Sequence, residues 1–329
     1  MVILVLTTIL ISIIFFQYFN YSIAKKLNLF DLPNIPRKIH KDKIPLTGGL
    51  FFIIIFFLNY IFHYLNSDFF LFKLIYLSLF FLSLFVIGFI DDRNNLQPTT
   101  RIIIITMLLI IFLSLDKSFN LNEIKIFIDK IYYYKKTETT LFMTTACILC
   151  LIILFNMIDG LDGLAILIFI CWYIYQFIFY KFDFNNDLLI FLSSIVFFYY
   201  NMKKKVFLGS SGNIIIALYI SLESIKIYNT NDNVDFLQIL LFFFIPFIDL
   251  FRLFFSRLSV TQHPFIGDSN HFHHKIYRIS KKFYLPIYVF FIATPCLLLN
   301  LFNLNILICF LTSLVLYFLL IIFEKLLTV

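Results

Sequence analysis

The chain has 329 residues, of which 61% are hydrophobic and only 14% are charged, and its formal net charge is +7. This balance excludes an ordinary soluble domain. Apolar runs of about 16 to 25 residues follow one another along the chain, and each can cross a hydrocarbon core roughly 30 Å thick. Lipid cannot satisfy backbone polar groups, so these runs predict an all-α polytopic integral membrane protein.

The apolar runs predict about 10–11 transmembrane helices in a single membrane domain, residues 1–329. The last apolar stretch is divided between Asn300 and Asn305. The expected spans lie near 2–24, 47–66, 71–90, 102–116, 139–157, 163–180, 187–202, 207–226, 236–254, 284–301 and 303–323.

The basic residues predict the orientation of these spans. No Lys or Arg precedes Lys25, which favours an uncleaved first helix with its N-terminus outside and, after eleven spans, a cytoplasmic C-terminus. On this topology roughly 18 Lys and Arg lie inside and 8 outside, as the positive-inside rule requires. The outside segment 117–137 alternates like a short hairpin. The positive charge therefore indicates topology, and nucleic-acid binding is not expected.

The first cytoplasmic loop, DLPNIPRKIHKDKIPLTGGL at 31–50, is basic and ends in a glycine pair. Its cations, among them Lys38, lie near anionic lipid head groups. Gly48 and Gly49 open the next predicted helix, whose N-terminus could receive an anion. This loop is a candidate binding segment for a phosphorylated substrate.

Two aspartate motifs follow predicted spans on the same side. Neighbouring carboxylates such as Asp91 and Asp92 repel each other unless a cation or a proton neutralises them. The alternative is a solvated helix cap. In NMIDGLDGLA, Asp159 and Asp162 are three residues apart and share one face of a helical turn. Their hard oxygen ligands suit Mg²⁺, which is usually shared with substrate phosphates.

The third motif, HPFIGDSNHFHHKI at 263–276, is a histidine cluster. A zinc site would need cysteine partners or a further well-spaced ligand, and neither is present. An accidental polar loop is the second alternative. We favour phosphate recognition or a proton relay beside the membrane. The aspartate motifs and the histidine motif all fall on the predicted cytoplasmic face, which indicates one site at that surface.

In this order, these stretches resemble the polyprenyl-phosphate N-acetylhexosamine-1-phosphate transferase family, the MraY/WecA-like enzymes of glycosyltransferase family 4. The resemblance covers Asp31 to Ile276. Its HFHH pattern is closer to the WecA-like branch than to the three-histidine run of MraY. PFIDLFR precedes it and carries Asp249 and Arg252.

The resemblance implies a bacterial inner-membrane enzyme that transfers N-acetylhexosamine-1-phosphate from a UDP-sugar to polyprenyl (undecaprenyl) phosphate. The reaction would release UMP. It would begin the synthesis of a cell-surface polysaccharide, such as lipopolysaccharide O-antigen, or of another cell-wall glycoconjugate. The resemblance also implies Mg²⁺ as the cofactor, with Mn²⁺ as a substitute, and contact with membrane lipids. A homodimer is compatible with the resemblance.

The same resemblance assigns roles to residues of this chain. Asp91 would activate the lipid phosphate, with support from Asp92. The implied catalytic residues are Asp91, Asp92, Asp159 and Asp162. The implied metal-binding residues are Asn156, Asp159, Asp162 and Ser210. The implied substrate-binding residues are Lys38, His40, Gly48, Gly49, Arg93, Arg101, Asp249, Arg252, Asp268, His271, His273 and His274.

Two positions depart from the family pattern. In FLGSSGN, Ser210 stands where the family carries an Asp that is a leading candidate for a magnesium ligand, and a hydroxyl binds Mg²⁺ much more weakly than a carboxylate. Ser269 stands where the WecA-like branch often has Arg. An alternative is therefore a degenerate member that binds lipid phosphate or a partner without catalysis. A secondary transporter is disfavoured, because ionisable groups gather at helix ends on one side rather than at the midplane.

Overall fold

The computed structural model describes residues 2–33, 42–66, 71–128, 131–135, 140–180, 184–232, 234–259 and 270–328. The predicted site residues Lys38, His40 and Asp268 lie outside these ranges, as does Ser269. The chain forms two compact units: Met1–Phe112 with Asp162–Ile220, and Leu113–Leu161 with Ser221–Val329.

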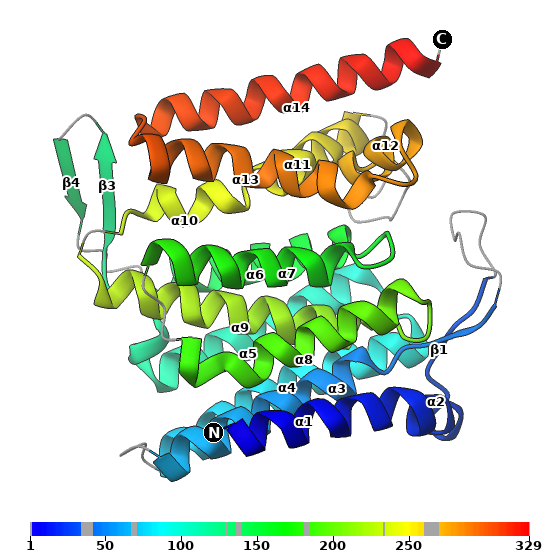
Figure 1. Ribbon diagram of the computed structural model, residues 1–329. Helices are drawn as coiled ribbons and strands as arrows, with labels where there is room; N and C mark the ends of the chain where they lie inside the picture. The colour runs from blue at the N-terminus through cyan, green and yellow to red at the C-terminus, as the bar shows by residue number, and fades with distance from the viewer. Residues whose placement is uncertain are drawn as a thin grey trace. The chain divides into compact units, whose positions relative to one another are not determined.

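The first unit is built from long apolar helices and one short strand pair. Helices α1 and α3 pack on α8, while α4 packs on α3 and α7 on α8 (Figure 1). β1 and β2 pair antiparallel, with Phe30 opposite Pro45. Its elements are α1 (Val2–Ile14), the π-helix η1 (Phe15–Phe19), α2 (Asn20–Leu27), β1 (Phe30–Asp31), β2 (Ile44–Pro45), α3 (Gly48–Asn66), α4 (Leu71–Asn94), most of α5 (Pro98–Leu115), α7 (Leu164–Tyr180), α8 (Phe184–Met202) and the first half of α9 (Gly209–Thr230).

Aromatic side chains fill the interior of the first unit. Phe56, Phe169 and Tyr219 are fully buried, and the Phe56 and Tyr219 rings stack with centroids 4.7 Å apart. The hydroxyls of Tyr173 and Tyr219 are 2.6 Å apart and share a hydrogen bond. A buried hydroxyl in an apolar interior needs such a partner, and the tyrosine pair meets that need between α7 and α9.

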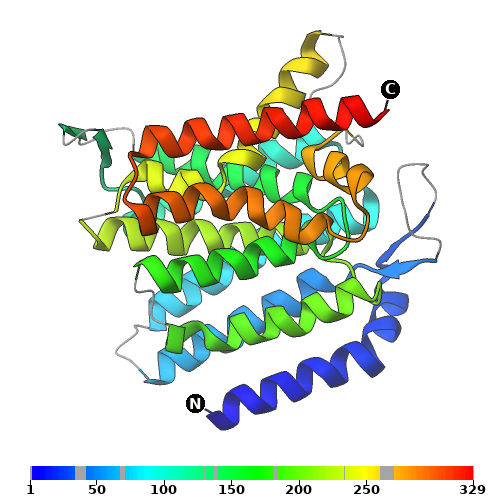
Figure 2. The ribbon, with the colours of Figure 1, turned by 45° about the horizontal axis from the view of Figure 1, so that its top comes forward.

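The second unit gathers the later helices around α13 and α14. Two views agree that α13 and α14 lie side by side, and α12 packs on both (Figures 1 and 2). Its elements are the end of α5, the 3₁₀ helix η2 (Lys117–Phe119), β3 (Ile124–Ile128), β4 (Ile131–Lys135), α6 (Thr140–Ile158), the second half of α9, α10 (Phe236–Phe242), α11 (Phe244–Ser259), α12 (Phe272–Ile279), α13 (Tyr284–Phe302) and α14 (Ile306–Thr328).

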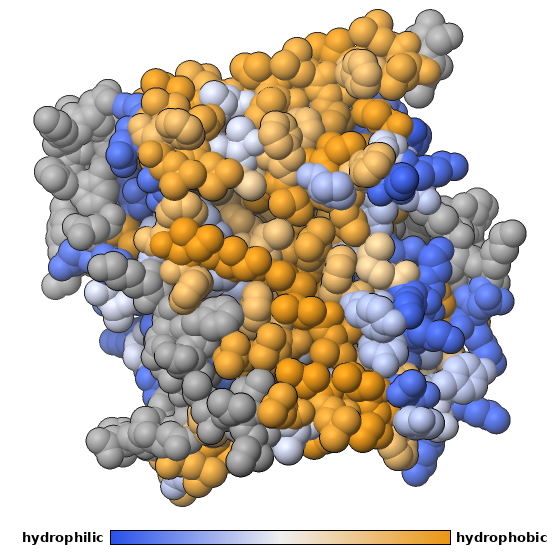
Figure 3. Space-filling model, in the orientation of Figure 1, coloured by the Kyte–Doolittle hydropathy of each residue, from blue (hydrophilic) through white to orange (hydrophobic). Residues whose placement is uncertain are grey.

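Large apolar side chains are exposed on the outer helices, as a lipid-facing surface requires. Leu311, Val315 and Phe318 on α14 are examples, and the visible face of that helix is hydrophobic (Figure 3). This surface confirms the predicted all-α polytopic membrane protein.

The predicted spans all fall on helices, although fewer helices qualify as spans by themselves. In the described ranges, six helices are long and apolar enough to cross a membrane: Leu6–Leu27, Leu71–Asn94, Pro98–Leu115, Thr140–Ile158, Tyr284–Phe302 and Ile306–Leu327. The predicted segments near 47–66, 163–180 and 187–202 correspond to shorter apolar helices. The segment near 207–226 is α9, whose first turn is polar and which is not among the qualifying helices.

The segment near 236–254 is not the continuous helix that its hydropathy predicts. It forms α10 and α11, which are bent by 74° at Phe243. Pro246 lies in the first turn of α11, and proline has no N–H to continue the hydrogen bonds of a preceding helix. A capping box of Asp235 and Gln238 fixes the start of α10. The broken helix places Asp249 inside the second unit rather than at a span end.

Two local predictions are confirmed. The antiparallel pair β3 and β4 is the hairpin expected in 117–137, with Ile124 opposite Lys135. The last apolar stretch divides between α13 and α14 as its asparagines predict. Asn303 ends α13 in the left-handed conformation, φ 51°, which Asn tolerates better than most residues.

Candidate active site

The aspartate pair lies on the last turn of α4, in the first unit. Arg101 on the first turns of α5 approaches Asp91, with Nη1 2.5 Å from Oδ2. The backbone N–H of Leu96 donates to Asp91 Oδ1 at 2.9 Å. The turn between α4 and α5 therefore wraps Asp91 and pairs it with a cation. A charged hydrogen bond of this kind fixes both side chains.

Asp92 points instead at the N-terminus of α9. Its carboxylate accepts hydrogen bonds from Ser210 N at 2.6 Å, Ser211 N at 3.1 Å and Ser211 Oγ at 2.5 Å. An N-terminal turn has unpaired N–H groups and a partial positive charge, so a carboxylate is stabilised there. Gly209 allows the approach: it has φ 72°, and a Cβ there would lie 2.8 Å from Asp92 Oδ1. Asp92 thus anchors the segment that carries Ser210.

Ser210 lies beside the arginine of the aspartate cluster. Its Oγ accepts a hydrogen bond from Arg101 Nη1 at 3.3 Å. The residue that stands where the family pattern has Asp therefore adjoins a guanidinium already paired with Asp91. The replacement of a carboxylate by a hydroxyl leaves this cluster with one negative charge fewer.

Gly48 and Gly49 start α3 as predicted, and both pack closely against the segment that leads into α9. Gly48 N donates to the carbonyl oxygen of Phe207 at 3.1 Å. A Cβ at Gly49 would lie 2.1 Å from Ser211 Oγ, and one at Gly48 would lie 2.6 Å from Leu208 Cα. The segment leading into α9 thus packs against this helix start, and anion binding there stays a prediction. The two glycines permit close packing of backbone on backbone.

The second half of the DGxDG motif belongs to the first unit. Lys204 Nζ lies 3.3 Å from Asp162 Oδ2. Gly163 has φ 78°, and its N–H donates to Asn201 Oδ1 at 2.6 Å. Asn201 Nδ2 in turn donates to the carbonyl oxygen of Val206 at 2.7 Å. Asn201 and Lys204 hold the motif in place, although sequence analysis did not select either residue.

The first half of the motif meets the histidines in the second unit. Asn156 lies in the last turn of α6 and Asp159 directly follows that helix. A Cβ at Gly160 would lie 2.7 Å from His273 Nε2 and 3.1 Å from His274 Nε2. Only a residue without a side chain permits this approach. Two motifs that are far apart in the sequence are therefore in contact, as the prediction of a common site requires.

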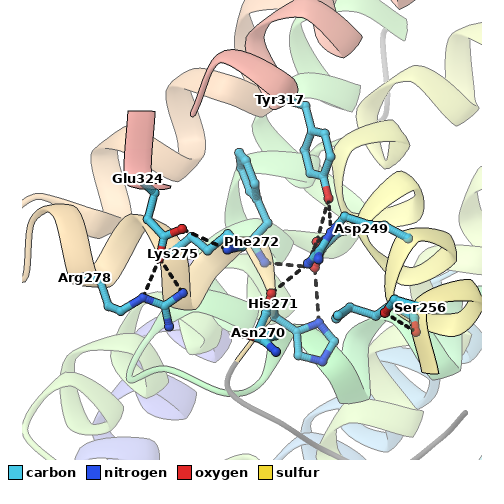
Figure 4. A network of polar contacts seen from close by, with 11 residues as sticks. Asp249, Ser256, Asn270, His271, Phe272, Lys275, Arg278, Tyr317 and Glu324 are labelled. Atoms are coloured by element: carbon cyan, nitrogen blue, oxygen red, sulfur yellow. Dashed lines mark hydrogen bonds and ion pairs between the residues drawn. The ribbon is translucent and has the colours of Figure 1, made fainter. Parts of the chain in front are cut away.

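Asp249 organises the start of the histidine motif (Figure 4). Its Oδ2 lies 3.2 Å from His271 Nδ1 and accepts the backbone N–H of Phe272 at 2.9 Å. Its Oδ1 accepts hydrogen bonds from Arg252 Nη2 and from the Tyr317 hydroxyl, both at 2.8 Å. Asp249 is only 4% exposed, so a carboxylate there needs this many donors.

The histidine rings lie against one another, and the first two are stacked. The His271 and His273 planes are 7° apart with centroids at 5.3 Å, and His273 and His274 are 4.4 Å apart. His273 is 3% exposed, and its Nε2 has no hydrogen-bond partner in the described part of the chain. Burial, followed by His274 and His271, lowers the pKa of His273 well below its usual value. Its imidazole is therefore neutral near pH 7.

A small pocket opens beside these histidines, between α6, α11 and α13. Asp249, His271 and His273 provide its polar lining, and the remaining lining residues are Leu154, Met157, Ile158, Pro246, Leu250 and Tyr288. The pocket places the polar ends of the motif against an apolar wall. Arg93, also predicted to bind substrate, is exposed on the last turn of α4 in the first unit.

The described residues do not present a preformed magnesium site. Within the described ranges, no group of three or more His, Cys, Asp or Glu side chains is arranged to hold a metal ion. Asp91 and Asp162 pair with cations, Asp92 accepts hydrogen bonds from α9, and Ser210 offers only a hydroxyl. Magnesium binding by the predicted residues therefore stays a prediction from the resemblance.

Known proteins resemble this chain over most of its length. The model described as glycosyl transferase family 4 matches residues 74–228. The undecaprenyl-phosphate alpha-N-acetylglucosaminyl 1-phosphate transferase of Thermotoga maritima is 28% identical over 254 residues, which is 76% of this chain and 74% of that protein. The proteins of the same name from Escherichia coli K12 and Shigella flexneri are each 27% identical over 308 residues, 84% of this chain and 77% of theirs.

The helices, the polar clusters and these matches define a multi-pass enzyme of the bacterial inner membrane, of the transferase class. The chain is similar to glycosyl transferase family 4 over residues 74–228, and its relatives are of the WecA-like kind. The resemblance drawn from the motifs is thereby confirmed.

Proposed function

We propose that this enzyme transfers N-acetylhexosamine-1-phosphate from a UDP-sugar to polyprenyl phosphate and releases UMP. The proposal rests on the contact between the DGxDG loop and the histidine motif at Gly160 and His273. That contact unites hydrogen-bonding groups suited to a diphosphate with carboxylates at the end of an apolar helix. The relatives named above carry this activity in their names, with N-acetylglucosamine as the sugar.

In the proposed reaction, a phosphate oxygen of the lipid attacks the β-phosphorus of the donor. A bond forms between that oxygen and phosphorus, the bond to the bridging oxygen of UMP breaks, and UMP leaves with the electron pair. Phosphoryl transfer depends chiefly on in-line positioning and on neutralisation of charge. The first unit offers Arg101 and Lys204 as cations for this purpose, and the second unit offers Arg252.

The aspartates have separate parts in this proposal. Arg101 would exchange Asp91 for the lipid phosphate, because the guanidinium can bind a phosphate as well as a carboxylate, and the freed Asp91 would activate that phosphate. Through the hydrogen bonds that it accepts from the start of α9, Asp92 would hold Ser210 next to Arg101 and Asp91. Any Mg²⁺ would bind together with the donor diphosphate, since Mg²⁺ is commonly held by one or two carboxylates and substrate phosphates.

The histidines would hold the diphosphate of the donor. His271 is oriented by Asp249, and the neutral His273 could accept or donate one hydrogen bond from its buried Nε2. From the predicted topology, we also propose that this site faces the cytoplasm. A homodimer and an O-antigen product remain proposals from the resemblance.

The test is UMP release by purified protein supplied with polyprenyl phosphate, Mg²⁺ and a panel of UDP-N-acetylhexosamines. We expect turnover with at least one donor, and a fall of about 100-fold or more in Asp91→Asn. Asp116→Asn is the matched control, because Asp116 caps the short helix η2 and lies outside the motifs. If the parent protein is folded but releases no UMP with any donor, the result would support the alternative suggested by Ser210. In that alternative, the protein is a degenerate family member that binds lipid phosphate without catalysis.

A further inference from the structure

The last helix contacts the histidine-bearing helix through two polar residues that no motif contains. Tyr317 and Glu324 are seven residues apart on α14, which is about two helical turns, so they share one face. Tyr317 is fully buried and Glu324 is 5% exposed. α14 packs against α12, and Figure 4 shows both side chains directed toward it. Such residues on an otherwise apolar helix call for an explanation.

Tyr317 reaches the start of α12 in two ways. Its ring stacks on Phe272, with centroids 4.8 Å apart. Its hydroxyl donates to Asp249 Oδ1 at 2.8 Å and accepts from Arg252 Nε at 2.7 Å. The ring therefore packs beside the histidine motif while the hydroxyl joins the carboxylate and the guanidinium.

Glu324 holds the following turns of the same helix. Its Oε2 accepts from Lys275 Nζ at 2.9 Å, and its Oε1 accepts from Arg278 Nε at 2.7 Å. The Lys275 ion pair is almost fully buried. Because a buried ion pair fixes relative position, α14 holds α12 at both of its ends.

The contacts of Tyr317 affect the orientation of the His271 imidazole, because both residues bind Asp249. Asp249 Oδ2 lies 3.2 Å from His271 Nδ1, while its Oδ1 is held by Arg252 and Tyr317. A carboxylate on Nδ1 selects the tautomer with a proton on that nitrogen and fixes the ring. The direction of the carboxylate depends in turn on the groups that bind its other oxygen.

We propose that Tyr317 is a positioning residue that acts through Asp249 to hold the His271 imidazole in the orientation and tautomer needed for the transfer reaction. This inference rests on the proposed function for its consequence in catalysis. It assigns the C-terminal helix, which lies outside the family match at 74–228, a part in the active site.

The test compares Tyr317→Phe with Tyr76→Phe. The first change keeps the ring that stacks on Phe272 and removes only the hydroxyl. The control also removes a buried hydroxyl, which donates to the carbonyl oxygen of Phe112. Tyr76 lies fifteen residues before Asp91 on α4, so the two residues are separated by about 22 Å along the helix axis. We expect Tyr317→Phe to lower kcat about tenfold with less than a twofold change in KM, and the control to keep both.

A second measurement is independent of turnover. The ¹⁵N spectrum of histidine-labelled protein reports the tautomer of each imidazole, and the His271→Gln spectrum assigns the His271 signals. We expect Tyr317→Phe to shift the His271 Nδ1 signal toward the other tautomer, and Tyr76→Phe to leave it unchanged. An unchanged His271 signal in Tyr317→Phe overturns the proposal, and so does an unchanged kcat. If the parent releases no UMP, the proposed function fails separately and the His271 signal alone decides the positioning.

Discussion

Ser210 Oγ lies 3.3 Å from Arg101 Nη1, and this nitrogen is also 2.5 Å from Asp91 Oδ2. The arginine thus bridges a catalytic candidate and the position where the family pattern has a carboxylate. An Asp at 210 would gain Arg101 as a neighbour and would lie in the first turn of α9, where the helix dipole favours negative charge. The backbone N–H that binds Asp92 would be unchanged.

We therefore predict that Ser210→Asp is folded and more active than the parent. A carboxylate binds Mg²⁺ more strongly than a hydroxyl, so the Mg²⁺ concentration for half-maximal UMP release should fall by about tenfold or more. The measurement is UMP release against Mg²⁺ concentration.

Ser211→Asp is the matched control for this prediction. It places the same charge one residue later, where the present side chain donates to Asp92 Oδ2 at 2.5 Å. Two carboxylates at that distance repel each other, so this variant should lose activity and stability. An equal Mg²⁺ requirement in Ser210→Asp and the parent would show that position 210 does not bind the metal.

A second prediction concerns the first residue of α9. Gly209 has φ 72°, and a Cβ there would lie 2.8 Å from both carboxylate oxygens of Asp92. Gly209→Ala should lower the free energy of unfolding by about 1–2 kcal/mol for the left-handed backbone alone, and by more if the Asp92 hydrogen bonds break. Ser210→Ala, which changes a residue in ordinary helical conformation, should be nearly neutral. Thermal unfolding in detergent measures both, and equal midpoints would contradict the role given to Gly209.

Sequence patterns predicted the features that depend on local spacing. The apolar runs marked the long helices, alternation marked the β3–β4 hairpin, and the asparagines from Asn300 to Asn305 marked the break before α14. The bend between α10 and α11 was not predicted, because averaged hydropathy is insensitive to Pro246 in the first turn of a helix.

The motifs identified the residues that meet but not what each one contacts. Nothing in the pair Asp91-Asp92 shows that the first binds Arg101 and the second the start of α9. Asn201 and Tyr317 are single polar residues without a repeating spacing, and only tertiary packing brings them to Gly163 and Asp249. A buried polar residue in an otherwise apolar helix was the available signal for Tyr317.

A third prediction is a pH dependence of stability from His273. Its pKa is lowered in the folded protein by burial and by His274 and His271, while Asp249 opposes the shift. Between that lowered pKa and the unfolded value of about 6.5, the unfolded chain binds more protons than the folded one. Stability should therefore be complete above about pH 6.5 and decline as the pH falls below it.

His273→Asn tests this assignment, since Asn cannot be protonated in this range. The unfolding midpoint of the parent should fall between about pH 7.5 and 5.5, and that of the variant should fall less. An identical slope in both proteins would assign the pH dependence to other groups.

The last prediction tests the contact that supports the proposed site. A Cβ at Gly160 would lie 2.7 Å from His273 Nε2, which is closer than real side chains approach, and a ring packed between His271 and His274 cannot easily move away. Gly160→Ala should displace the DGxDG loop from the histidines and lower UMP release by about 100-fold, because a shift of about 1 Å is enough for such a loss. Gly212→Ala is the comparison: its added Cβ would lie 2.8 Å from Leu208 Cγ and 3.1 Å from Gly49 N, so it adds the same methyl group in a crowded place without meeting a histidine. If Gly160→Ala retained full turnover, the two motifs would not need this contact to act on one substrate.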